Sequence, residues 1–267
     1  MRVQFIINKH NCIRDVNASM ALILRDYLAS HGCQATDHAP DIIHVFGRWN
    51  NQYARIIRHY YNYKIPIVFT AIDGIQSLAD KENGSFHLNI SPRQIIRYSS
   101  VIHTSGPMEE KLVKHVCKEA ETCIIQNPAI TASLTNSEMG NKMYELYKDT
   151  IGVHDRRIRN DIEAKVAQTN TKIKEIDELC SEILYIKYLT HRRNIPKETI
   201  DNLTEKLLQT QYDEDIMAET MKELKIDKFA ASLFYVLCSI SSLSEGFVPT
   251  YIKYDRTAQF ISKSITN

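Results

Sequence analysis

The sequence predicts an α/β protein: an open, mostly parallel, Rossmann-like sheet over residues 1–132, followed by an all-α helical region over residues 133–267. Two observations lead to this fold class. In the first half, short apolar runs rich in β-branched residues alternate with stretches of helical spacing, which is typical of parallel strands joined by helices. In the second half only long helical spacing is found, and five of the eight glycines precede residue 130.

The segment Asp41–Gly74 is the clearest β-α-β unit. Strands expected at 42–46 and 66–71 are each followed by a glycine, and the helix expected over 50–62 places tyrosine and isoleucine side chains on one face. Open parallel sheets bind ligands beyond the carboxyl ends of their strands, so these glycines mark the place where we expect a site.

Further elements of the same kind surround this unit. Asn17 can cap a helix that Gly32 ends, residues 75–91 predict a long polar loop, and Pro107 suits the first turn of a helix. The expected strands lie at 3–7, 33–36, 101–106 and 121–127, and further helices at 93–98 and 107–118.

The second half predicts a helical bundle, or helices that wrap around the first domain. Favourable first turns begin at Pro196 and at Asp213, and Leu179, Ile183, Ile186 and Leu189 form one apolar stripe. The expected helices span about 137–150, 155–168, 171–193, 197–209, 213–224 and 227–241.

Composition excludes some classes of protein. A net charge of +1 with 24% charged residues favours neither a nucleic-acid binder nor a disordered acidic tail. The six cysteines include no C-x-x-C pair and no zinc-site spacing, so we expect reduced thiols and predict no metal or cofactor. The start of the chain lacks a basic segment typical of secretory signals, and the apolar run 229–243 is too short to span a membrane. We therefore expect a cytoplasmic protein, with peripheral association at the inner membrane face as the alternative.

Candidate site residues lie at the expected strand ends. Glycine there allows a ligand to approach the backbone, although turns alone can also explain it. Arg48 can hold a phosphate through two hydrogen bonds, and the amides after Gly106 can hold an anion. Asp73 or His10 is our candidate general base. The predicted substrate-binding residues are Lys9, Gly47, Arg48, Gly74, Ser105 and Gly106.

Other features are better explained by structure than by chemistry. No dinucleotide or P-loop fingerprint is present, because the loop after the first strand contains no glycine. His44 and His103 fall within expected strands, where we expect histidines of the core with satisfied hydrogen bonds; the alternative is a role as ligands. Tyr60, Tyr61 and Tyr63 are explained by helix packing more readily than by a stacking surface.

The order of these pieces resembles the N-terminal, acceptor-side domain of a GT-B glycosyltransferase of the retaining, family-4 type. The residues that carry the resemblance are Asp41–Gly47, Ile65–Gly74, Val101–Ser105 with the helix after it, and Cys123–Pro128. It covers about residues 1–130 and implies that Arg48 and Asp73 face the acceptor-side cleft, with Asn127–Pro128 at the exit toward a donor domain.

The nucleotide-sugar-binding second domain of that family is not recognisable here. Ser244–Phe247 is similar to the family's donor motif, but Lys253 stands where its second glutamate is expected, and we interpret the match as coincidental. The resemblance implies a glycosyltransferase-like protein of cell-surface polysaccharide assembly, acting on a sugar or lipid-linked sugar acceptor. Its partner would be a donor-domain subunit or a further copy of this chain. The rival hypotheses are a non-catalytic binding or scaffolding protein and, third, a small hydrolase, for which no G-x-S-x-G motif is present.

Overall fold

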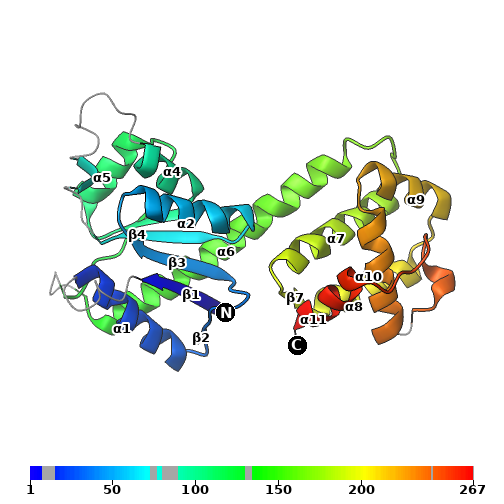
Figure 1. Cartoon of the computed structure of the whole chain (residues 1–267), viewed down its shortest axis with the longest axis horizontal. Helices are drawn as coiled ribbons and strands as arrows, with labels where there is room; N and C mark the ends of the chain where they lie inside the picture. The colour runs from blue at the N-terminus through cyan, green and yellow to red at the C-terminus, as the bar shows by residue number, and fades with distance from the viewer. Residues whose placement is uncertain (8–15, 73–76, 80–89, 130–133, 242, 267) are drawn as a thin grey trace. The chain divides into compact units, whose positions relative to one another are not determined.

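The structure is a computed structural model that describes residues 1–7, 16–72, 77–79, 90–129, 134–241 and 243–266. The chain divides into two compact units, Met1–His154 and Asp155–Asn267. The first unit contains a parallel sheet covered by helices, and the second is almost entirely helical (Figure 1). The predicted fold class, α/β with a helical C-terminal region, is confirmed.

Six parallel strands form the sheet, in the order β2-β1-β3-β4-β5-β6. Strand β2 pairs only with the start of β1. The central strands β3 and β4 are buried on both faces, which explains why their sequences are apolar apart from His44 and Thr70. The strands are β1 (Arg2–Ile7), β2 (Gln34–Ala35), β3 (Ile42–Gly47), β4 (Ile67–Ala71), β5 (Val101–Thr104) and β6 (Thr122–Ile124).

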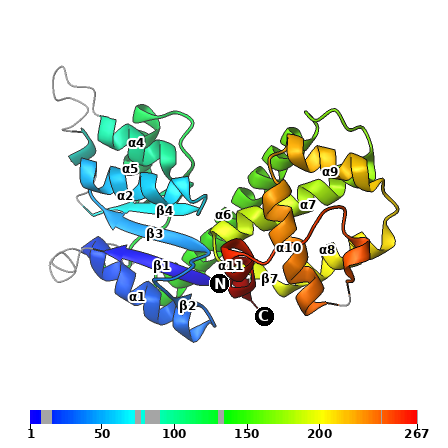
Figure 2. The ribbon, with the colours of Figure 1, turned by 45° about the vertical axis from the view of Figure 1, so that its right-hand side comes forward.

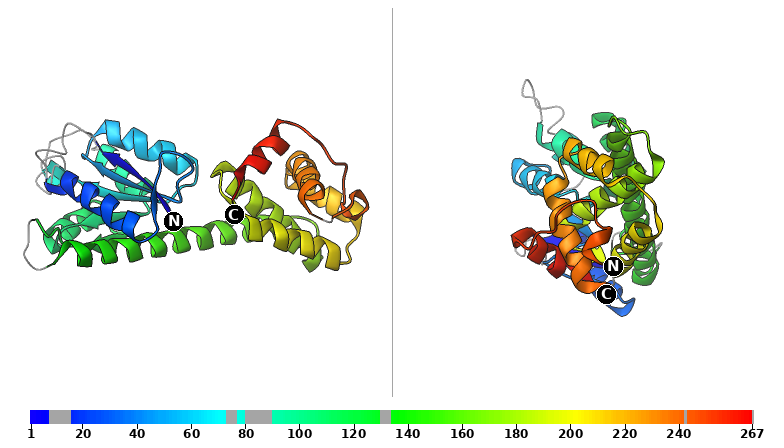
Figure 3. Two further views of the ribbon diagram at one scale, coloured as in Figure 1. Left: turned by 90° about the horizontal axis from the view of Figure 1, so that it is seen from below. Right: turned by 90° about the vertical axis from the view of Figure 1, so that its right-hand side faces the viewer.

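Helices cover both faces of this sheet. On one face, α2 (Asn51–Asn62), α4 (Ile90–Tyr98) and α5 (Pro107–Val116) pack on the side chains of the odd-numbered residues of β3 and β4. On the other face lie α1 (Val16–Ser30) and the first half of α6 (Asn136–Val166), shown in green beneath the sheet in the left view of Figure 3. Gly32 follows α1 with a φ of +73°, as expected of a glycine that ends a helix.

The long helix α6 differs from the prediction. Two helices were expected between residues 137 and 168, but one continuous helix runs from Asn136 to Val166. Its inner face carries Met139, Met143 and Tyr147, all fully buried against the sheet. Gly140 lies where any side chain would overlap the ring of Tyr27 in α1, so this glycine allows the two helices to approach. The division between the compact units falls inside α6, after His154, whereas the composition changes near residue 132.

The second unit is a bundle with one large apolar core (Figure 2). The predicted helices after α6 are present, and Asp213 caps its helix by accepting a hydrogen bond from the amide of Ile216 at 3.0 Å. Helix α11 and the short parallel pair β7–β8 were not predicted. The elements are α7 (Lys174–His191), β7 (Ile195–Pro196), α8 (Lys197–Gln209), α9 (Glu214–Glu223), α10 (Asp227–Ile240), the 3-10 turn η1 (Glu245–Phe247), α11 (Arg256–Ser264) and β8 (Ile265–Thr266).

The segment before the glycosyltransferase-like motif is helical. Residues 234–240, which would have to be a strand in a true donor motif, belong to α10. This agrees with the interpretation of Ser244–Phe247 as a coincidental match. Within the described residues, no helix combines the length and apolar character needed to cross a membrane.

Candidate functional site

The strand order defines where a ligand would bind. From β1 the chain moves outward to β2, then returns to the opposite side of β1 and continues from β3 to β6. The order therefore reverses between β1 and β3. In open parallel sheets the crevice beyond the carboxyl ends of the strands at such a reversal is the usual ligand site. Here those ends are Ile7 of β1 and Gly47 of β3, in neighbouring register.

Four of the predicted site residues lie outside the described residues. They are Lys9 and His10, after β1, and Asp73 and Gly74, after β4. The predicted catalytic pair therefore remains a prediction. The other four predicted residues, Gly47, Arg48, Ser105 and Gly106, are described and can be compared one by one.

Arg48 is at the reversal point. It directly follows β3, and its side chain is exposed, with no carboxylate partner within the described part of the chain. The next residues fix the backbone around it. Trp49 is buried against Phe69, and Asn50 caps α2 by accepting a hydrogen bond from the amide of Tyr53 at 3.2 Å. A solvent-facing guanidinium thus stands on a well-anchored turn, which suits the recognition of an anionic oxygen group.

Gly47 has a packing role. A Cβ atom at this position would overlap the ring of Tyr53, which is 5% exposed and belongs to the core beneath α2. The absence of a side chain at Gly47 is therefore explained by a close contact inside the protein. It does not require a ligand, and Gly47 itself is buried.

Ser105 and Gly106 form the entrance to α5. The amide of Ser105 donates a hydrogen bond to Oε2 of Glu109 at 2.7 Å. Burial raises the pKa of Glu109, and this hydrogen bond acts in the opposite direction. The amide of Ser105, one of the predicted binding residues, is thus already taken by a carboxylate of the same helix. Gly106 itself has open space where a side chain would be.

A buried chain of polar groups crosses the sheet below this edge. It runs from Tyr147 of α6 to Nδ1 of His44 at 2.5 Å, and from Nε2 of His44 to the hydroxyl of Thr70 at 2.7 Å. The same hydroxyl reaches Nδ1 of His103 at 2.8 Å, and Nε2 of His103 reaches the carbonyl of Ile125 at 2.8 Å. All four side chains are at most 2% exposed.

The donor in each of these hydrogen bonds follows from the last one, between His103 and the carbonyl of Ile125. A carbonyl can only accept, so Nε2 of His103 carries the proton and Nδ1 accepts from Thr70. The single hydroxyl proton of Thr70 is then used, and Thr70 accepts from Nε2 of His44. Nδ1 of His44 consequently accepts from the hydroxyl of Tyr147. Each ring nitrogen has one partner of the correct kind, and the hydroxyl of Thr70 has one donor and one acceptor, with both imidazoles neutral.

Electrostatics agree with neutral imidazoles. Burial lowers the pKa of His103 to about 4, an effect that the bond to the Ile125 carbonyl partly offsets. Burial, and next the neighbouring His103, lowers the pKa of His44 well below its usual value. The expectation of core histidines with satisfied hydrogen bonds is confirmed. Their partners were missed, although Met139, Met143 and Tyr147 recur every four residues, which is a signal of one buried helix face.

The cavities of the first unit do not gather the predicted residues. A cavity of about 370 Å³ lies beside β1, lined by side chains of β1 and α1 and by residues at and just after β2, among them Phe5, Arg25 and Asp37. It is on the β2 side of β1, whereas Arg48 follows β3 on the other side. In the described ranges, no group of three or more metal-ligating side chains is found.

Comparison with known proteins found no match. No family model, curated protein or solved structure matches this chain.

Proposed function

We propose that this chain is a glycosyltransferase-like protein of cell-surface polysaccharide assembly that supplies the acceptor-binding half of a cleft. The observation that carries the proposal is the reversal of strand order between β1 and β3, with the exposed guanidinium of Arg48 beside it. An acceptor sugar attached to a lipid phosphate or pyrophosphate offers the oxygens that such a guanidinium binds.

The donor site would be supplied by another subunit. In the described part of the second unit, the strands are β7 and β8, of two residues each, and the rest is helical. A nucleotide-binding α/β sheet of the usual size has no place there. A separate donor-binding chain, or a further copy of this chain, would therefore complete the cleft, near the strand end that Asn127 and Pro128 follow.

Chemistry at the edge is assigned by residue type. Asp73, after β4, and His10, after β1, are the proposed general bases that remove a proton from the acceptor hydroxyl. Lys9 and Gly74 would contribute charge and backbone access beside them. The buried His44 and His103 are excluded from this role, because their ring nitrogens are already paired inside the core.

A second candidate is a non-catalytic binding or scaffolding protein that uses the same edge. Two observations favour it. Glu109 occupies the amide of Ser105, and Gly47 is required by the ring of Tyr53, so both features exist without any ligand. Under this alternative the edge binds a glycan or a protein partner, and nucleotide sugars bind neither to the chain nor to a complex that contains it.

Binding can be tested with the purified full-length chain. We expect an isoprenoid-pyrophosphate-linked sugar in detergent micelles to raise the melting temperature, because a ligand of the native state stabilises it by about 2.7 kcal/mol at one hundred times its Kd. Arg48→Gln should abolish the shift, and Arg58→Gln, which removes an exposed arginine of α2, should retain it. An equal shift in wild type and Arg48→Gln would contradict the proposed site.

Transfer is tested separately. The chain is mixed with a donor-binding subunit encoded beside it, and transfer of labelled sugar to the acceptor is measured. Asp73→Asn or His10→Gln should abolish transfer while acceptor binding persists, because only the base is lost. Binding without any transfer, with every nucleotide sugar offered, would favour the scaffolding alternative.

A further inference from the structure

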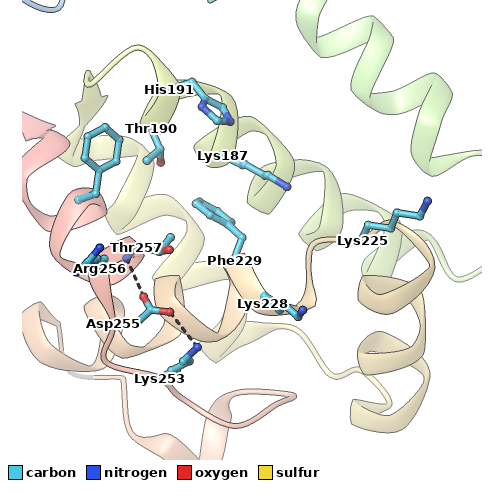
Figure 4. A pocket seen from close by; sticks show the side chains of 11 residues that line it. Lys187, Thr190, His191, Lys225, Lys228, Phe229, Lys253, Asp255, Arg256 and Thr257 are labelled. Atoms are coloured by element: carbon cyan, nitrogen blue, oxygen red, sulfur yellow. Dashed lines mark hydrogen bonds and ion pairs between the residues drawn. The ribbon is translucent and has the colours of Figure 1, made fainter.

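A concave basic pocket lies within the second unit, and all of its lining residues belong to that unit. Its walls come from the last turns of α7, the turn before α10, the start of α10 and the start of α11 (Figure 4). The cavity measures about 620 Å³, which is within the range of small-molecule sites. It combines charged and aromatic side chains that are far apart in the sequence.

The charge of this pocket is strongly one-sided. Five of its lining side chains are lysine or arginine, and Asp255 is the single carboxylate among the lining residues. The cations are Lys187, Lys225, Lys228, Lys253 and Arg256.

Asp255 is already engaged. Its Oδ1 accepts hydrogen bonds from the amides of Thr257 at 2.8 Å and Ala258 at 3.0 Å, which caps α11, and its Oδ2 pairs with Lys253 at 3.2 Å. Ser232 donates to the same carboxylate. One lysine of the pocket is therefore neutralised. The other four basic side chains form no ion pair within the part of the chain that the structure describes, although the carboxylate of Asp227 acts on Lys187 from a greater distance.

Lys187 and His191 are two basic side chains of the pocket whose pKa values are lowered. It is half-buried, and its Nζ lies 5.9 Å from the centre of the Phe229 ring. Burial lowers its pKa, and Lys165 at the end of α6 lowers it further, while Asp227 has the opposite effect. The pKa of His191 in the same wall is lowered by burial and by Lys187. An added anion would relieve this repulsion.

Aromatic side chains supply the apolar part of the surface. Phe229 lies among the labelled side chains in Figure 4, and Phe260 of α11 is 37% exposed. The hydroxyl of Thr190 is used inside its own helix, where it donates to the carbonyl of Ile186 at 2.7 Å. The pocket therefore offers cations and ring faces, and it suits a ligand that carries both an anionic group and a flat or apolar group.

We propose that this pocket binds the phosphate group of a small phosphate ester, with Lys187, Lys228 and Arg256 around the phosphate oxygens and Phe229 and Phe260 against the rest of the ligand. Phosphate is favoured over a single carboxylate because the walls of this one cavity carry four basic side chains that form no ion pair among the described residues, and a phosphate or pyrophosphate provides more charge and more acceptor oxygens. The site is independent of Arg48 and of the proposed transferase function.

Isothermal titration of the full-length chain with ADP and with inorganic pyrophosphate tests the proposal, together with sedimentation on vesicles of phosphatidylglycerol or phosphatidylcholine. We expect saturable binding of at least one phosphate probe that weakens as salt increases. Lys187→Gln, Lys228→Gln and Arg256→Gln should each weaken it about tenfold or more. The matched control is Lys197→Gln, an exposed lysine at the start of α8, which should bind as the wild type does. Circular dichroism confirms that each variant is folded.

The arms of the experiment identify the source of the phosphate. Tighter binding of ADP than of pyrophosphate assigns a role to the phenyl rings, and equal binding assigns the affinity to phosphate alone. Sedimentation with phosphatidylglycerol but not phosphatidylcholine, lost in the pocket variants, identifies a lipid headgroup. The proposal is overturned if no phosphate probe binds, if Lys197→Gln weakens binding as much as the pocket variants, or if only a long oligonucleotide binds. Loss of acceptor binding in Arg48→Gln leaves these results unchanged, so the two proposals fail separately.

Discussion

Gly47 is the last residue of the buried strand β3 and Gly106 follows β5, but the surroundings of the two glycines differ. At Gly47 a methyl group would overlap the ring of Tyr53, whereas at Gly106 no atom lies within 4 Å of where it would be. Gly106 also has an extended backbone, with φ −172°, that any residue adopts. One glycine is therefore required by packing, and the other leaves room that a ligand can use.

We predict that Gly47→Ala destabilises the protein by about 1–3 kcal/mol, because it overpacks a well-filled core. Gly106→Ala is the matched control and should change stability by less than about 0.5 kcal/mol. Urea unfolding followed by far-ultraviolet circular dichroism measures both. If the two variants are equally stable, the contact with Tyr53 does not explain Gly47.

The neutral histidines His44 and His103 should make stability depend on pH. Their pKa values in the folded state are depressed below the unfolded value near 6.5, to about 4 for His103. The unfolded chain therefore binds more protons as pH falls below 6.5. The stability from these two groups is complete above that pH and is lost progressively toward pH 4.

We predict that the free energy of unfolding falls by about 1.4 kcal/mol per pH unit for each histidine below pH 6.5. Urea midpoints at pH 7.5 and 5.5 measure this slope. His103→Gln, which keeps a donor for the Ile125 carbonyl, should reduce the slope by about half. An unchanged slope in that variant would contradict the neutral network. So would assigned imidazole resonances of His44 or His103 that titrate near pH 6.5 in the folded protein.

At the scale of single elements, the second half of α6 is joined to α7 by a buried ion pair. Nη1 of Arg192 lies 3.0 Å from Oδ1 of Asp155 and 3.0 Å from the hydroxyl of Tyr188, and the arginine side chain is only 3% exposed. Arg159 stacks 3.7 Å from the centre of the Tyr185 ring in the same interface. A buried guanidinium needs its counter-charge far more than an exposed lysine does.

We predict that Asp155→Asn destabilises the second unit by about 1–3 kcal/mol, because Arg192 loses its charged partner while remaining buried. Glu178→Gln is the control, because Glu178 pairs with Lys174 at the surface, where the two side chains are 56% and 85% exposed. That change should cost less than about 0.5 kcal/mol. Similar losses in the two variants, measured by urea unfolding, would show that burial does not distinguish these pairs.

At the scale of the whole molecule, the chain has separate cores in two compact units. One unit has apolar clusters on both faces of its sheet, and the other has a single helical cluster. Helix α6 is continuous across the boundary between the two units and contributes residues to both. Unfolding of one unit can therefore affect the stability of the other through this helix.

We predict two thermal transitions in scanning calorimetry of the full-length chain. Ile67→Ala should lower the transition of the sheet unit and Ile183→Ala that of the helical unit, each by several degrees, because both side chains are completely buried and each deletion costs about 2–5 kcal/mol. A single transition that both variants lower equally would show that α6 couples the two units into one cooperative block.

Local patterns were sufficient for most of the fold. The β-α-β unit at residues 41–74 and the helices after residue 170 follow from the spacing of apolar side chains, which the chain itself carries. Helix α11 was missed because it has only nine residues, six of which are polar. The break expected between residues 150 and 155 contains Gly152, a poor helix former, but α6 continues through it.

The sequence by itself determined the parallel sheet, its glycine-marked strand ends, the place of Arg48 after a strand, and the burial of His44 and His103. Only the tertiary structure decided which strands are neighbours, so it located the reversal between β1 and β3. It also supplied the hydroxyls of Thr70 and Tyr147 to the histidines, turned Glu109 onto the amide of Ser105, and brought Lys187 and Arg256 to one pocket. The physical reason is the distance along the chain over which each interaction acts. Strand and helix periods arise from neighbours in the chain, whereas hydrogen bonds and converging charges join residues that only folding brings together.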